Sequence, residues 1–162
     1  MSCRVYARAR TLATRGPERE NGAAAVEFAL ISPILFALLF GIIGYGYMLS
    51  FRQGISQGAA EGARAAAVEF NSANQSTAAL AALNRSLGAY GVSCVGTNLI
   101  REGDTVGSCS VTIDTCSNNA SKTCASVSVS YAYRDHPLLP SFPGLGGTMP
   151  EDLDYTAVAE VS

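Results

Sequence analysis

The sequence predicts an α+β protein with a long N-terminal transmembrane helix that extends outward, a short second helix and a small antiparallel sheet with disulfides. Three observations support this fold class. Residues 28–51 form an apolar run of 24 residues without a charge. The segment that follows is rich in Ala, Gln, Glu and Arg, which favour a helix. Beyond residue 90, the spacing of apolar side chains changes from the helical period of about 3.6 to the strand period of 2.

The apolar run is long enough to cross a membrane. As a helix it spans about 36 Å, and the hydrocarbon core of a bilayer is roughly 30 Å thick. A buried core helix of this length does not suit a protein of 162 residues. A cleaved secretory signal has an apolar region of only about 7–15 residues, followed by a cleavage site. Here "SFRQGISQGAAEGARAAAVEF" follows instead, so we expect one helix from about residue 24 to about residue 70, half in lipid and half outside.

The rear of the chain predicts a second helix and then strands. "NSANQ" at 71–75 is a break, and "STAALAALNRSLGAYG" predicts a short helix with Ser76 as N-cap and Gly88 as C′ residue. "SCSVTIDT", "ASVSVSYAYR" and "YTAVAEV" (the last at 155–161) alternate as strands do, while the Pro- and Gly-rich segment 135–154 predicts a loop. We therefore expect a three- or four-stranded antiparallel sheet.

Four of the five cysteines lie beyond the apolar run, and Cys3 lies in the basic leader. The four are Cys94, Cys109, Cys116 and Cys124. Such a cluster in a small extracytoplasmic region favours two disulfides over free buried thiols. Proximity alone favours 94–109 and 116–124 among the three connectivities, the second pair closing the neck of a hairpin. A zinc site is disfavoured because the spacings lack a CxxC pair and the single histidine, His136, is far away in sequence. We expect no metal and no cofactor.

The charges are unevenly distributed. Residues 1–22 carry five arginines and two glutamates, a net charge of +3, whereas residues 23–162 carry a net charge of −5. An acidic folded part argues against nucleic-acid binding, which needs a basic patch there. The asymmetry fits a single-pass protein of the cytoplasmic (inner) membrane with a cytoplasmic N-terminus. We divide the chain into a basic leader (1–22), a transmembrane and exit helix (23–70) and an extracytoplasmic α+β domain (71–162).

A motif stands at the entrance of the apolar run. Gly22 lies at the cytoplasmic edge, and Glu27 follows five residues later within the apolar helix. This is the pattern of a type IV prepilin-like signal. More closely, "GAAAVEFALISPILFALLFGIIGYG" resembles the TadE-like family of the tight-adherence (Flp) pilus system, over about residues 22–70. The resemblance implies a pilin-like fold and the role of a minor pilin or pseudopilin. Its partners would be other pilins or pseudopilins, the pilus assembly machinery and membrane lipid.

The resemblance also implies cleavage between Gly22 and Ala23 by a membrane-embedded aspartyl prepilin peptidase on the cytoplasmic side. Glycine leaves the backbone accessible because it has no Cβ. An intramembrane carboxylate such as Glu27 is expensive and marks a functional-site hypothesis. In pilins its partner is the N-terminal amine of a neighbouring subunit, so Glu27 and the adjacent Phe28 would set the register between subunits during assembly. The alternative is that Glu27 lies at headgroup level and extends toward water.

A stripe of small residues begins near the end of the apolar run and continues beyond it. Its members recur at every fourth position: Gly46, Ser50, Gly54, Gly58, Gly62 and Ala66. Small residues at this spacing let helix backbones approach closely. Each step overshoots a full turn by roughly 40°, so the stripe winds around the helix and suits a partner that crosses at an angle, or two partners in turn. General richness in Gly and Ala is the alternative. Pro33, inside the run, is expected to kink or loosen the helix.

No catalytic arrangement is evident in the sequence. Four cysteines assigned to disulfides leave no obvious thiolate, and "PGLGGT" lacks the residues of a phosphate loop. We therefore expect a structural and assembly role rather than an enzyme. Two alternatives remain: an uncleaved signal-anchored envelope protein whose outer domain binds a ligand, and an adhesin-like tip subunit that makes contact through the loop at 135–154.

Overall fold

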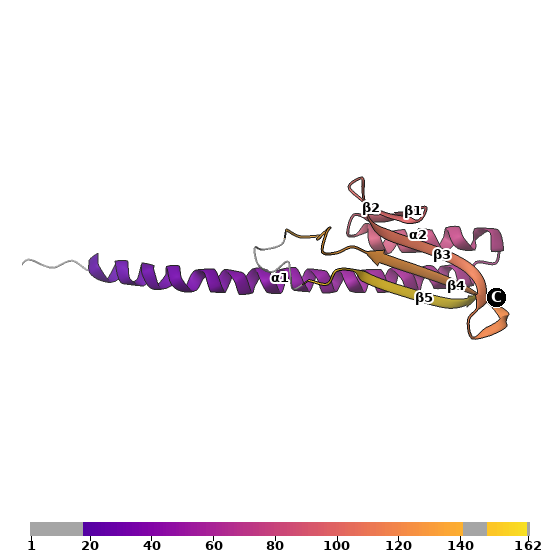
Figure 1. The fold of residues 1–162 in the computed structure, drawn as a ribbon, viewed down its shortest axis with the longest axis horizontal. Coiled ribbons are helices and arrows are strands. Elements are labelled where there is room, and N and C mark those ends of the chain that lie inside the picture. Colours follow the sequence, from indigo (N-terminus) through magenta and orange to yellow (C-terminus); the bar gives the residue numbers. More distant parts are fainter. Residues whose placement is uncertain (1–17, 141–148, 162) are drawn as a thin grey trace, which may run out of the picture. The chain divides into compact units, whose positions relative to one another are not determined.

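The computed structural model describes residues 18–140 and 149–161, with side chains from Gly22 onward. The chain divides into two compact units, and the boundary between Leu38 and Leu39 falls inside a single helix. Figure 1 shows the elements in chain order, beginning with this helix, α1, and ending with strand β5.

Helix α1 spans Glu18–Val68 and contains the whole apolar run. It begins a few residues before the predicted start and continues through Pro33. It ends where the sequence predicts a break. There the carboxylate of Glu69 accepts a hydrogen bond from the N–H of Asn71 at 3.1 Å, and the side chain of Asn71 accepts one from the N–H of Ala73 at 3.0 Å. Such local acceptors offer the backbone an alternative to further helix.

A 3₁₀ turn, η1 (Ser72–Asn74), leads into helix α2 (Gln75–Gly88). The predicted helix is confirmed, but its predicted caps are wrong. Asn74 takes the N-cap position without a side-chain cap, and Gly88 is the last helical residue. The buried Gln75 holds this end instead, because its Nε2 donates to the carbonyl of Glu69 at 3.2 Å. One side-chain amide therefore ties the start of α2 to the end of α1.

Five antiparallel strands form one sheet in the order β1-β2-β3-β4-β5. They are β1 (Val92–Val95), β2 (Asn98–Arg101), β3 (Asp104–Cys116), β4 (Asn119–Tyr131) and β5 (Leu153–Val161). The predicted three or four strands were too few, because β1 and β2 have four residues each and show too little alternation. Tight turns join them to each other and to β3. Gly96, Glu102 and Gly103 have positive φ angles of 64°, 54° and 97°, as two-residue hairpin turns require.

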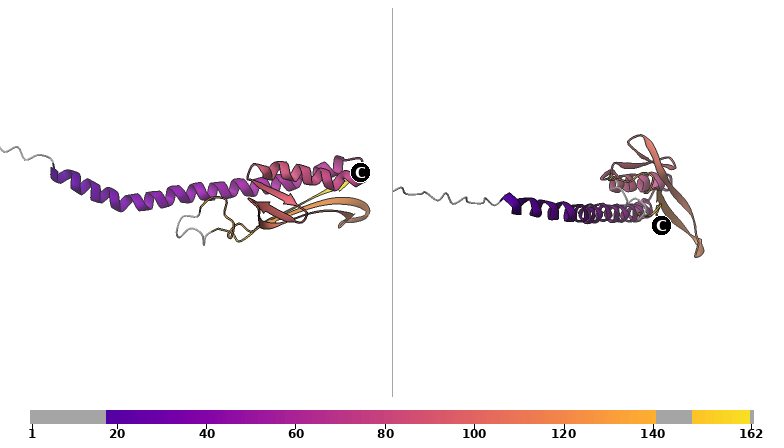
Figure 2. Two further views of the ribbon diagram at one scale, coloured as in Figure 1. Left: turned by 90° about the horizontal axis from the view of Figure 1, so that it is seen from above. Right: turned by 60° about the vertical axis from the view of Figure 1, so that its left-hand side comes forward.

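One face of the sheet packs against α2 and the part of α1 after Leu39, as the left view of Figure 2 shows. The buried hydrophobic side chains of α1 recur every three or four residues: Met48, Phe51, Ile55, Ala59, Ala63 and Ala66. They meet the inward side chains of β4, which are Ala125, Val127, Val129 and Tyr131. Helical and strand periodicities thus supply the two sides of one core.

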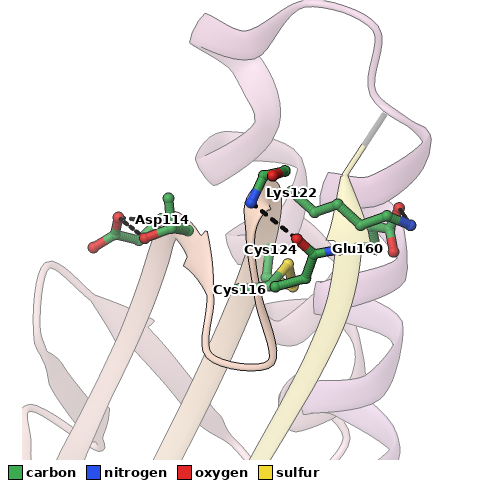
Figure 3. The surroundings of a disulfide bond; sticks show 8 residues. Asp114, Cys116, Lys122, Cys124 and Glu160 are labelled. Carbon is green, nitrogen blue, oxygen red and sulfur yellow. Dashed lines mark hydrogen bonds and ion pairs between the residues drawn. A yellow bond between two sulfur atoms is a disulfide. The ribbon is translucent and has the colours of Figure 1, made fainter.

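Both disulfides have the predicted pairing. Cys94–Cys109 joins β1 to β3 with a Cα–Cα distance of 6.0 Å, and Cys116–Cys124 joins β3 to β4 with a Cα–Cα distance of 5.0 Å. Figure 3 shows the second bridge at the β3–β4 hairpin, where Lys122 forms an ion pair with Glu160 of β5. This ion pair is about half exposed, so it adds little stability. The covalent bond is the stronger constraint on the hairpin.

Candidate functional site

The predicted cleavage site lies near the start of α1. The helix begins at Glu18, so the bond between Gly22 and Ala23 lies within its first two turns. A methyl group on Gly22 would meet nothing within 4 Å in the described part of the chain, so packing does not require glycine there. The first N–H groups of a helix have no intrahelical partner, and this end opens more readily than the middle. A protease that binds an extended segment can therefore reach this bond after only the first turns of α1 unfold.

Glu27 lies four residues after Ala23 on the same helix. This spacing is about 6 Å along the axis and places the two residues on nearly the same face. Both are exposed, as is Phe28. Within the described residues, Glu27 takes part in none of the three side-chain ion pairs of the structure. The structure thus aligns Ala23 and Glu27, and the role of Glu27 and Phe28 in register stays a prediction.

The apolar segment of α1 is largely exposed before Met48. From Gly22 onward, where the structure describes side chains, the first α1 residue that is buried in the core is Met48. The most apolar 18-residue window of the helix has a mean hydropathy of 2.4, and none of this window is buried. A core helix of a soluble protein would be mostly covered, and an apolar surface of this length in water would promote association. By length, composition and exposure, the helix fits a single-pass membrane anchor.

The later part of the small-residue stripe is used inside the chain. A methyl group on Gly58 would lie 3.0 Å from the Cβ of Ser86, and one on Gly62 would lie 3.1 Å from the carbonyl oxygen of Ala79. Ser86 and Ala79 belong to α2, so these glycines let α2 pack closely on α1. Gly58 and Gly62 therefore lie at a contact between two helices of the same chain.

The other members of the stripe divide between core and surface. Ala66 is fully buried, and a methyl group on Gly54 would lie 2.6 Å from the ring carbon Cε2 of Tyr90. Gly46 and Ser50 are exposed. Packing of this stripe against other subunits stays a prediction, and Gly46 and Ser50 are the members left exposed for it.

An aromatic cluster joins α1 to the folded domain. It consists of Tyr47, Phe51, Tyr90, Tyr131 and Tyr133. The ring of Phe51 meets Tyr90 and Tyr131 edge to face, with centroid distances of 4.9 and 4.8 Å. Tyr131 also donates to the carbonyl of His136 at 2.8 Å, and burial raises the pKa of Tyr131 and Tyr133 above the usual tyrosine value. The tyrosines were visible in "YGYMLSF" and "YAY", but only the fold brings them together.

The two edges of the sheet differ. At the β1 edge, Asn84 of α2 donates from Nδ2 to the carbonyl of Cys94 at 3.1 Å and accepts from the N–H of Cys94 at 2.6 Å. Its amide therefore takes the place of a neighbouring strand. At the opposite edge, β5 pairs with β4 on one side only within the described residues. Sequence reasoning missed Asn84, and the only available signal was a polar residue in the apolar stretch "LAALNRSL".

The outer face of the sheet is rich in hydroxyl groups. A shallow hollow of about 360 Å³ lies over it, and its lining includes Asp154, Tyr155 and the hydroxyl side chains of Ser108, Ser110, Ser128, Ser130 and Thr156. The hydroxyls of Ser128 and Thr156 are 2.8 Å apart. In residues 18–140 and 149–161, no three His, Cys, Asp or Glu side chains are grouped closely enough to hold a metal ion. This face thus offers several hydroxyl groups together with the carboxylate of Asp154.

The family model described as TadE-like protein matches residues 22–64. The match agrees with the resemblance seen in the sequence, and it contains Gly22, Glu27 and the small-residue stripe up to Gly62. It associates the chain with the tight-adherence pilus system. No curated protein and no solved structure matches the chain.

Proposed function

We propose that this chain is a minor pilin or pseudopilin that acts in the assembly of a tight-adherence (Flp-type) pilus. It is inserted in the inner membrane with its N-terminus in the cytoplasm, trimmed after Gly22 by a prepilin peptidase, and assembled through helix packing. The TadE-like match over residues 22–64 carries this proposal. One continuous helix contains the cleavage glycine, the glutamate five residues later and the apolar span.

Cleavage after Gly22 would change the charge at the start of the helix. Cutting after Gly22 removes the basic leader and creates a positive amine on Ala23, at the end of a helix whose own dipole is already positive. A carboxylate near this end is therefore stabilising, and Glu27 is the only acidic residue between Ala23 and the end of the apolar run. When subunits pack side by side in lipid, the amine of one and the Glu27 of the next offset part of each other's burial cost. Assembly then depends on cleavage.

N-terminal sequencing of the membrane-bound protein tests the cleavage. In cells that contain the prepilin peptidase the chain should begin with AAAVEFAL, and in cells that lack it the leader should remain. Gly22→Val should retain the leader in both, because a β-branched side chain blocks close approach to the bond. Gly46→Val, at an exposed glycine of the same helix, is the matched control and should be cleaved normally. A chain that still begins before Gly22 in the presence of the peptidase contradicts the proposal and favours an uncleaved signal-anchored protein.

Replacement of Glu27 separates cleavage from assembly. Glu27→Gln keeps the size of the side chain and removes its charge, so we expect a cleaved protein and a strong loss of pili, counted by electron microscopy. Glu61→Gln is the control, because Glu61 is an exposed acidic residue of the same helix outside the apolar run. Normal piliation in Glu27→Gln would exclude the charge pair.

A further inference from the structure

The apolar surface of α1 continues beyond the depth of a bilayer. Counted from Ala23, about 20 residues cross roughly 30 Å of hydrocarbon and end near Ile42. The uncharged run continues to Phe51, and Arg52 is the first charged residue after it. In this interval the surroundings of α1 change, because Ile42 is 72% exposed and Met48 is 3% exposed. The folded domain therefore begins within two turns of the end of the span.

Two tyrosines lie at this transition. Tyr45 is 51% exposed and Tyr47 is 37% exposed. The ring of Tyr47 meets that of Tyr90 edge to face with a centroid distance of 6.1 Å, so Tyr47 is fixed to the domain as well as to the helix. Tyrosine is enriched at membrane interfaces because its ring is apolar and its hydroxyl reaches water.

Met149, which is far from this part of α1 in the sequence, lies beside the same part of the helix. A methyl group on Gly44 would lie 3.8 Å from Cε of Met149, so an apolar side chain lies beside the helix one turn before Met48. The backbone of Met149 is held in place. Its carbonyl accepts from the guanidinium of Arg134 at 3.1 Å, and Arg134 also pairs with Glu151 at 2.7 Å. We call Gly44, Tyr45, Tyr47 and Met149 the base of the domain.

We propose that the base lies in the phospholipid headgroup region of the bilayer that α1 crosses, so that the folded domain rests directly on the membrane surface. This inference rests on the membrane insertion contained in the proposed function. Lipid is the occupant that fits, because the base continues the exposed apolar surface of α1, contains no charged residue and presents two interfacial tyrosines. The aromatic cluster around Phe51 joins the domain directly to α1.

Tryptophan fluorescence can measure this depth, because the chain contains no tryptophan. The full-length protein is placed in phosphatidylcholine vesicles brominated either near the headgroup or near the chain end. Tyr45→Trp and Met149→Trp should lose fluorescence with the shallow bromines and keep it with the deep ones. Leu35→Trp, in the apolar span, should lose it with the deep bromines. Val158→Trp, on the outer face of β5, is exposed and should lose it with neither.

The outcomes separate the two proposals. If Tyr45→Trp and Met149→Trp behave as Val158→Trp does while Leu35→Trp is quenched, the helix is inserted but the base stands clear of lipid, and the inference is wrong. If Leu35→Trp is not quenched either, both the base and the membrane insertion fail. The near-UV circular dichroism of each variant checks its fold. Should Met149→Trp misfold, Tyr45→Trp still decides the question, because Tyr45 is 51% exposed.

Discussion

Replacing Gly54 by alanine places a methyl group 2.6 Å from Cε2 of Tyr90, whereas two carbon atoms ordinarily lie about 3.5–4 Å apart. The ring cannot move aside freely. Its hydroxyl donates to the carbonyl of Ser50 at 2.9 Å, and its ring packs against that of Phe51 at a centroid distance of 4.9 Å. To fit the methyl group, the ring must move by about 1 Å away from these contacts.

Two opposing terms set the size of the effect. Overpacking costs about 1–3 kcal/mol, and alanine in place of glycine inside a helix gains about 1 kcal/mol. We therefore expect Gly54→Ala to lower the free energy of unfolding of the domain by about 1 kcal/mol. In a Tyr90→Ala background the clash is absent, so the same substitution should raise stability by about 1 kcal/mol. The change in free energy of unfolding caused by Gly54→Ala should therefore have opposite signs in the two backgrounds, and the coupling energy between the two sites should be about 2 kcal/mol.

The measurement is urea unfolding of the full-length protein in detergent micelles, followed by the near-UV circular dichroism of its tyrosines. Gly88→Ala is the matched control, because a methyl group on this glycine of α2 would meet nothing within 4 Å among the described residues. It should be neutral or slightly stabilising in both backgrounds. If Gly54→Ala stabilises the wild-type protein as much as it stabilises the Tyr90→Ala variant, the steric argument is refuted.

Three further outcomes can be measured in the same assay. Asn84→Ala leaves the N–H and carbonyl of Cys94 without their side-chain partner and should cost about 1–3 kcal/mol, whereas a loss below a few tenths would show that water replaces the amide. Replacing both Cys94 and Cys109 by serine opens a loop with a sequence separation of 15 and should lower the free energy of unfolding by about 3 kcal/mol. Equal stability of the oxidised wild-type protein and the double variant would contradict this. Burial raises the pKa of Tyr131 and Tyr133, so the folded state keeps protons that the unfolded state loses above about pH 10. Stability should therefore be level below that pH and fall as the pH rises above it, and a flat profile through this range would show that these hydroxyls are not protected by the fold.

Much of the fold follows from local patterns in the chain. The length of the apolar run and the composition after it predict one long helix that continues beyond the run, and α1 is continuous from Glu18 to Val68. The alternation in "ASVSVSYAY" predicts β4, and the hairpin brings Cys116 and Cys124 together as proximity suggests. These features depend on residues close in sequence, so neighbouring side chains determine them.

Other features depend on contacts between distant residues. The strands β1 and β2 are too short to carry a periodic signal, and their place in the sheet depends on β3 and on the turns at Gly96 and Gly103. The predicted caps of α2 were wrong because Gln75 bonds to the end of α1 instead. The small-residue stripe could be found in the sequence, but not the fact that Gly58 and Gly62 receive α2 of the same chain.

The same division applies to the candidate site. The sequence by itself determined the spacing of Gly22 and Glu27 and the apolar span, because these are properties of one continuous helix and need no other part of the molecule. Only the tertiary structure decided where that helix enters the domain. Phe51 belongs to α1, Tyr131 to β4 and Tyr90 to the turn between α2 and β1, and their rings meet only when the sheet and α2 close around α1. Periodicity selects the face that each element buries, whereas side-chain packing between elements selects which buried faces meet.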